Sequence, residues 1–229
     1  MSTASRVRRW LSPVLLGAWC VVACGVALRG QEPDHNDGPA VPNLTDVDSD
    51  LLRLVAEDQW DRGMDMFGGR QIKPPEAIDW AAVTVRDEKR QAAVRKMLAE
   101  GRIRTPREQH FAALIFQHSG RSGDLTLAHV LASTAAAGGH GHARWLAAAS
   151  FDRLLRSMDR PQVFGTQFSS DEASGWTMER YDRDAVSDHL RAEWCVVPLN
   201  EQERILRDLR AGRPVSPSTS APGCGERAP

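Results

Sequence analysis

Apolar residues recur along the middle of the chain at the spacing of helices. Leu51, Leu54 and Val55 mark one such period, and Phe111, Leu114 and Ile115 mark another. Residues at i, i+3, i+4 and i+7 share one face of a helix, so the pattern predicts helices with one buried side. The predicted helices cover about 46 or 48 to 67, 85–100, 106–119, 124–137, 142–158, 184–194 and 201–211.

The helix that begins near residue 106 has the clearest start signal. Residues 105–108 read Thr-Pro-Arg-Glu, a capping box with proline at the first helical position. His118 falls on the apolar face of this helix, near its end. For the last predicted helix we expect Asn200 as the N-cap, with Glu203 reaching back to it.

Residues 163–168 and 176–181 alternate like a two-stranded ribbon around a Ser/Asp/Gly turn. A lone hairpin is marginal in water, so this one has to pack against the helices. The predicted fold class is therefore mainly α: a single compact helical domain over 46–211 with a short β-hairpin.

The N-terminus indicates export. Arg6, Arg8 and Arg9 precede an uncharged apolar stretch, 10–28, which predicts a leader or membrane-anchor helix over 1–30. Three forms remain open: a lipoprotein with Cys24 lipidated, an uncleaved single-pass anchor, and a secreted protein whose leader is removed. We expect a cell-envelope protein that faces outside the cytoplasm, with the membrane as its partner through the N-terminus.

Two polar segments flank the helical domain. Residues 31–45 are predicted to be a flexible linker and residues 212–229 a disordered tail, because both are rich in Pro, Gly or Ser and lack an apolar period. Cys195 and Cys224 could form a disulfide in an oxidising compartment; the alternative is a buried Cys195 and a free Cys224.

Charge and motifs exclude several functions. The formal net charge is −1 with both signs interspersed, which argues against a nucleic-acid partner. No phosphate-binding loop, dinucleotide fingerprint or nucleophile elbow occurs, so no cofactor is expected. His129, His140 and His142 cluster without a carboxylate or cysteine at ligand spacing, so no metal site is expected either.

Polar residues that helix building does not explain form the candidate site. We hypothesise that they meet in one pocket that binds an unknown small molecule or envelope component. They are Asp58, Gln59 and Arg62 in the first helix, Gln117 and His118 ending the third, Asp152 and Arg153 in the fifth, and Gln162, Gly165, Thr166 and Gln167 in the segment after it.

In the pocket hypothesis, His118 is a general base oriented by Asp152, and Arg153 holds an anionic group. Gln162 and Gln167 read hydroxyls or amides of a sugar or peptide, and Gly165 lets the backbone approach the ligand.

A structural alternative stays open for the same residues. Asp152 and Arg153 could pair with the loop backbone, and the loop glutamines could satisfy the hairpin. Asp58 and Arg62, spaced i, i+4, could be a surface ion pair.

The spacing of these groups resembles the signature of a bacterial family of unknown function. It consists of Asp-Gln…Arg at 58–62, Gln-His at 117–118, Asp-Arg at 152–153 and Pro-Gln-x-Phe-Gly-Thr-Gln at 161–167, over about 51–209. The resemblance implies a fold neighbourhood but no activity. We therefore expect a ligand- or partner-binding domain, with a hydrolase-like enzyme or a structural assembly subunit as alternatives.

Overall fold

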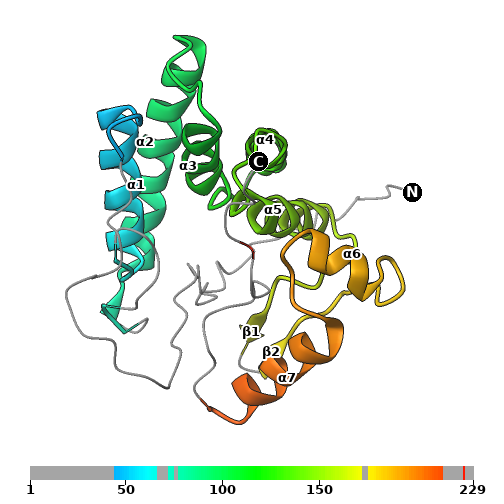
Figure 1. The fold of residues 1–229 in the computed structure, drawn as a ribbon. Coiled ribbons are helices and arrows are strands. Elements are labelled where there is room, and N and C mark those ends of the chain that lie inside the picture. Colours follow the sequence, from blue (N-terminus) through cyan, green and yellow to red (C-terminus); the bar gives the residue numbers. More distant parts are fainter. Residues whose placement is uncertain (1–43, 66–71, 75–76, 172–174, 214–223, 225–229) are drawn as a thin grey trace, which may run out of the picture.

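The computed structural model describes residues 44–65, 72–74, 77–171, 175–213 and 224. The mainly helical fold with a short antiparallel hairpin is confirmed for these residues (Figure 1). The elements are α1 (Ser49–Asp61), α2 (Trp80–Ala99), α3 (Pro106–Phe116), α4 (Ser122–Ala137), α5 (Ala143–Ser157), β1 (Ser169–Asp171), β2 (Gly175–Thr177), α6 (Asp188–Glu193) and α7 (Leu199–Arg210).

Several sequence predictions lie outside the described residues. They are the leader with Cys24, most of the 31–45 linker, and residues 214–223 and 225–229 of the predicted tail. Within the described part of the chain, no helix is both long and apolar enough to cross a membrane.

The first two helices differ from prediction at their ends. The Asp48 carboxylate caps α1 by accepting from two main-chain N–H groups of its first turn. α1 then ends well before the predicted stop at Gly68, because Gly63 has a φ of 69° and ends the helical conformation first. α2 begins before the predicted Val85, because the Asp79 side chain caps it there.

The predicted capping box of α3 is present. Thr105 Oγ1 accepts from the Glu108 N–H at 3.2 Å, and the Glu108 carboxylate accepts from the Thr105 N–H at 2.9 Å. The same carboxylate also accepts from the N–H of Asp48, the capping residue of α1, at 3.1 Å. Glu108 therefore ties the N-terminal ends of α1 and α3 together.

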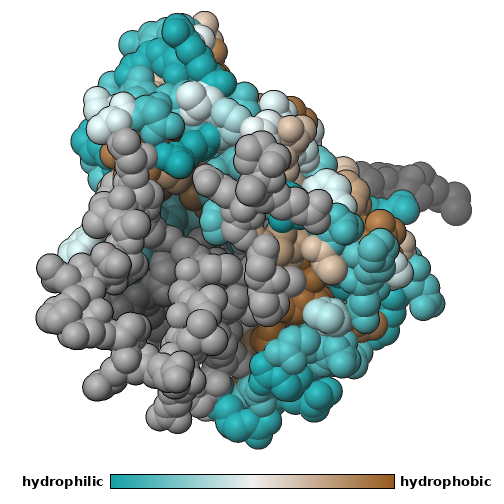
Figure 2. Space-filling model, in the orientation of Figure 1, coloured by the Kyte–Doolittle hydropathy of each residue, from teal (hydrophilic) through white to brown (hydrophobic). Residues whose placement is uncertain are grey.

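The main core lies among α1 to α5. α4 packs along both α3 and α5, and small buried alanines on α4 and α5 let these helices approach closely. In Figure 2 the visible surface over α7 and over the far end of α2 is hydrophilic, and apolar atoms show mainly between α5 and α7. The larger buried side chains of the core include Leu51, Val55, Val94, Ile115, Phe116 and Leu146.

The hairpin is shorter than predicted, and its first strand comes later in the sequence. Its outer pair is Ser169 with Thr177, and its inner pair is Asp171 with Gly175. Residues 163–167 form a loop instead of a strand. The cause is a side chain of α5, Asp152, which takes the main-chain N–H groups that a strand would use.

The last two helices are joined by an unexpected contact. α7 has no side-chain cap, so the predicted Asn200 cap was wrong. Instead, the N–H of Leu199 donates to the carboxylate of Asp188, the first residue of α6, at 2.9 Å. Cys195, just after α6, forms a disulfide with Cys224 at a Cα–Cα distance of 5.6 Å. Of the two alternatives for these cysteines, the structure has the disulfide. Cys224, which lies within the predicted tail, is buried.

Candidate functional site

The last turn of α1 places three polar side chains in the interior. Asp58, Gln59 and Arg62 are exposed by only 1%, 2% and 5%. Arg62 Nη1 donates to Asp58 Oδ1 at 2.8 Å, so the ion pair exists but is buried rather than on the surface. A buried pair needs further partners, because the loss of hydration offsets much of its attraction.

α2 supplies those partners. Arg62 Nη2 donates to Asp87 at 2.7 Å, and Arg90 donates to both Asp87 and Asp61 at 2.7 Å. Asp87 and Arg90 were not among the predicted site residues. Both lie at positions of the apolar period of α2, on the same face as its buried valines and methionine. Charged residues inside an apolar period were the signal that could have identified them.

The end of α3 faces this ionic network. Gln117 is the C-cap of α3, and Nε2 of the next residue, His118, lies 3.6 Å from Asp58 Oδ2. Burial, followed by the nearby guanidinium of Arg62, holds the pKa of His118 well below its usual value. Burial also raises the pKa of Asp58 to about 6, against the opposing effect of Arg62. At neutral pH the imidazole is therefore neutral and the carboxylate charged.

Asp152 is not hydrogen-bonded to His118, so the predicted pairing was wrong. Its Oδ1 accepts from the N–H groups of Val163 and Phe164 at 2.8 and 3.0 Å. Its Oδ2 accepts from the N–H and hydroxyl of Thr166 at 2.9 and 2.8 Å. These donors fill the acceptor sites of a carboxylate. Asp152 thus holds the 163–166 loop against α5 and is not available to orient an imidazole.

The side chains of the loop are also bound within the protein. Gln162 Nε2 donates to the carbonyls of Gln167 and Met178 at 2.9 and 2.6 Å, and its Oε1 accepts from the Gln167 N–H at 2.8 Å. Gly165 has a φ of 73°, and a Cβ there would meet the Tyr181 ring at 3.1 Å. These contacts match the structural alternative for the loop residues, because they fix the loop and hairpin on the helices.

Arg153 joins the loop to the end of α3. Its Nε donates to Gln167 Oε1 at 2.9 Å, and its Nη1 donates to the carbonyl of Gln117 at 2.7 Å. Burial, followed by the charge of Arg62, lowers the pKa of Arg153 to about 9. Arg153 was predicted to hold an anion. In the structure its Nε and Nη1 instead donate to acceptors of the protein.

Within the described part of the chain, some buried polar atoms near the ends of α1 and α3 have no hydrogen-bond partner, and others of this kind lie elsewhere, for example on Ser133 and Trp145. Among the described residues, no partner exists for Gln59 Oε1, His118 Nε2 or either amide atom of Gln117. Gln59 Nε2 and His118 Nε2 both face the same oxygen, Asp58 Oδ2, at 2.9 and 3.6 Å. We call Asp58, Gln59, Gln117, His118 and Arg153 the junction site.

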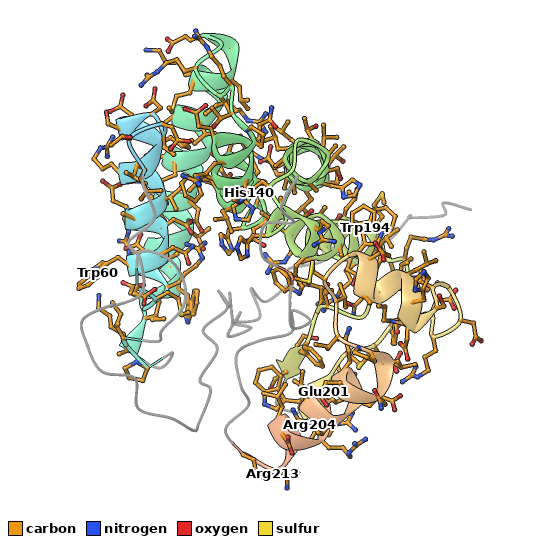
Figure 3. The ribbon with its side chains drawn as sticks, in the orientation of Figure 1. Trp60, His140, Trp194, Glu201, Arg204 and Arg213 are labelled. Atoms are coloured by element: carbon orange, nitrogen blue, oxygen red, sulfur yellow. A yellow bond between two sulfur atoms is a disulfide. The ribbon has the colours of Figure 1, made fainter. Side chains whose placement is uncertain are left out.

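A separate open hollow lies on the outer side of the ionic network. It is lined in part by Trp60, Met64, Asp61 and Arg90, and the last two also belong to the network. Trp60 projects from α1 away from the other helices (Figure 3), with an exposed fraction of 57%. The lining of this hollow includes none of the five residues of the junction site.

The histidines of the α4–α5 region make other contacts. His129 Nδ1 lies 2.9 Å from the carbonyl of Ala147. The His140 ring packs edge-on against the partly buried His110 ring, with a centroid distance of 4.8 Å. Over the residues that the structure describes, no group of three His, Cys, Asp or Glu side chains could hold a metal ion.

Comparison with protein-family models, with curated proteins and with solved structures gives no match. The resemblance to a bacterial family of unknown function therefore stays a prediction. The junction site is interpreted below from its own chemistry.

Proposed function

We propose that this chain is a ligand-binding domain and that its ligand lies at the junction site. The observation that carries the proposal is the buried carboxamide of Gln117, which has no hydrogen-bond partner in the described part of the chain; Gln59 Oε1 and His118 Nε2 also lack one there. Buried polar atoms in proteins are almost always hydrogen-bonded, and leaving one unpaired costs about 1–3 kcal/mol. Each such atom needs an explanation, and a hydrogen-bond partner supplied by a ligand is the one proposed for Gln117.

The geometry favours binding over the hydrolase-like alternative. A general base needs an orienting partner. The expected partner of His118 is Asp152, whose carboxylate oxygens already accept hydrogen bonds from the loop. The carboxylate nearest to His118 is Asp58, which already accepts from Arg62 and Gln59. A buried imidazole with a low pKa among arginines is also a weak proton acceptor.

The assembly-subunit alternative fits only part of the molecule. It expects the polar groups to be buried and mutually satisfied. Gln162 and Gln167 meet this expectation through their bonds to the loop and hairpin. Gln117 does not, since both of its side-chain polar atoms lack a partner among the described residues.

We also propose that the domain acts in the cell envelope, attached to the membrane through residues 1–30. The apolar leader motivates this location. The Cys195–Cys224 disulfide supports it, because disulfides persist in oxidising compartments and are rare in the cytosol.

The test is a melting screen of the full chain, purified in mild detergent, against sugars, peptides and lipid headgroups of the envelope. A ligand that binds the folded state raises the melting midpoint by mass action. We expect at least one compound to raise the midpoint of the wild type and to have little effect on a Gln117→Met variant. The proposal fails if no compound raises the midpoint, or if every response is the same in the variant.

A further inference from the structure

We infer that the junction site takes an uncharged ligand with an amide group, and that the Gln117 carboxamide pairs with that amide. This inference rests on the binding function proposed above and specifies the chemistry of the ligand. It follows from which atoms of the site are hydrogen-bond donors and which are acceptors.

The side-chain amide of Gln59 has a defined orientation. Its Nε2 lies 2.9 Å from Asp58 Oδ2, and an ionised carboxylate accepts hydrogen bonds but does not donate them. The nitrogen therefore faces Asp58, and the oxygen is left buried with no donor among the described residues. A ligand at this point has to supply an N–H or O–H group.

Gln117 needs both kinds of partner. Its exposed fraction is 1%, and within the described ranges neither Nε2 nor Oε1 has a hydrogen-bond partner. The side chain thus presents N–H donors and an acceptor side by side in one plane. An extended peptide presents the N–H and C=O of one residue on the same edge and meets both in one pair of hydrogen bonds. Two hydroxyls would have to lose rotational freedom to do the same.

Charged ligands do not match this set of atoms. A carboxylate brings only acceptors and would leave the amide oxygens of Gln59 and Gln117 without donors. An ammonium group brings only donors and would leave Gln117 Nε2 unpaired. The ionised Asp58 would also repel an anion. Arg62 and Arg90 are already bound to carboxylates, and Arg153 of the junction site donates to Gln167 and to the Gln117 carbonyl.

Amide groups occur in peptides and also in N-acetylated sugars, whose single trans amide meets only one of the two Gln117 atoms, so the experiment separates the two sources. The full chain in mild detergent is titrated with N-acetylglucosamine, N-acetylalanine methylamide, glucose or acetate. We expect an amide probe to raise the melting midpoint by about 3 °C at roughly ten times its dissociation constant. Glucose and acetate should have no comparable effect. The amide probe that acts identifies the source as sugar or peptide.

Two variants locate the response. Gln117→Met removes both hydrogen-bonding atoms and should weaken binding of the amide probe about tenfold. Gln109→Met makes the same chemical change on α3 outside the junction site and should leave the affinity unchanged. In the wild type, the side-chain N–H₂ signals of Gln117 in a nitrogen-15 spectrum should shift when the amide probe binds.

The outcomes separate the inference from the proposed function. If glucose or acetate alone acts, and Gln117→Met abolishes that response, the amide chemistry is overturned while the binding function stands. If an amide probe acts equally on wild type and Gln117→Met, the pairing with Gln117 is overturned. If none of the four probes acts, the inference is overturned, and the wider screen above decides the binding function.

Discussion

Asp58 Oδ2 and His118 Nε2 lie 3.6 Å apart, where the last turn of α1 meets the end of α3. Burial raises the pKa of Asp58 to about 6 and holds the pKa of His118 well below its ordinary range. Burial therefore favours the neutral form of both groups. This gives the junction site a dependence on pH whose sign can be worked out for each group.

Replacing His118 by Asn should alter how stability depends on pH. A group whose pKa is lowered by folding contributes stability above its unfolded pKa, near 6.5 for histidine, and this contribution is lost as the pH falls. The advantage of the wild type over His118→Asn should therefore shrink between about pH 7 and pH 5. Urea denaturation at each pH measures it, and a constant difference across this range would contradict a buried neutral imidazole.

Asp58 should act in the opposite sense. Its raised pKa contributes stability at low pH, and this contribution is lost as the pH rises through about 6. Asp58→Asn lacks this contribution, so its free energy of unfolding should fall more steeply than that of the wild type as the pH drops from about 6 to 4. Parallel curves for the two proteins would show that folding does not shift the pKa of the Asp58 carboxyl.

Gln117→Met should stabilise the protein without ligand. The substitution removes two unpaired polar atoms from the interior and keeps a similar volume, so we expect a gain of about 1 kcal/mol in the free energy of unfolding. Gln167 is the matched control. It is equally buried, but its side chain bonds to Arg153, Thr166 and Ala149. Gln167→Met should therefore lose about 2 kcal/mol. Denaturant unfolding compares the two, and equal losses would make Gln117 an ordinary structural residue.

Asp152→Asn should destabilise the fold rather than remove a base. Its new N–H₂ group would face N–H donors of the loop, which leaves donors unpaired. We expect a loss of about 2–4 kcal/mol and faster hydrogen exchange at the N–H groups of Val163, Phe164 and Thr166. Full stability and unchanged exchange would argue against its role in holding the loop.

Gly165→Ala should cost more than Gly175→Ala, although both glycines have positive φ angles, 73° and 65°. A Cβ at Gly165 meets Tyr181 and Met178 at 3.1–3.3 Å, whereas at Gly175 it meets nothing within 4 Å. The backbone cost is of order 1 kcal/mol at each position, and crowding adds to it only at Gly165. Melting midpoints of the two variants test this, and equal midpoints would show that the loop absorbs the methyl group.

Local signals predicted much of the fold. The Thr105–Glu108 box fixed the start of α3, because both of its bonds lie within one turn. The C-terminal end of α1 and the position of the hairpin were predicted less accurately, whereas the start of α1 at Asp48 agrees with the prediction. Gly63, inside the apolar period, ended α1 early, and Asp152 took the N–H groups of the segment that alternates like a strand.

Most residues of the candidate site were predicted from the sequence, but the contacts between them were not. Asp58, Gln117, His118 and Arg153 were all singled out, and the structure brings them together. The partner of His118 was wrong, because side-chain pairing between helices depends on how the helices pack and not on spacing within one helix. Asp87 and Arg90 were missed, because charged residues on a helix are usually taken to be exposed. Their positions within the apolar period of α2 were the sign that they are buried.

Glu108 has a mechanical consequence for the junction site. Its single carboxylate clamps the starting ends of α1 and α3 through the N–H groups of Asp48 and Thr105. Because these ends are tied together, a rotation of one helix against the other would occur about Glu108. The opposite ends, beside Asp58 and His118, would move the most. The 3.6 Å separation of Asp58 and His118 is therefore the distance in the junction site that responds most to the angle between α1 and α3.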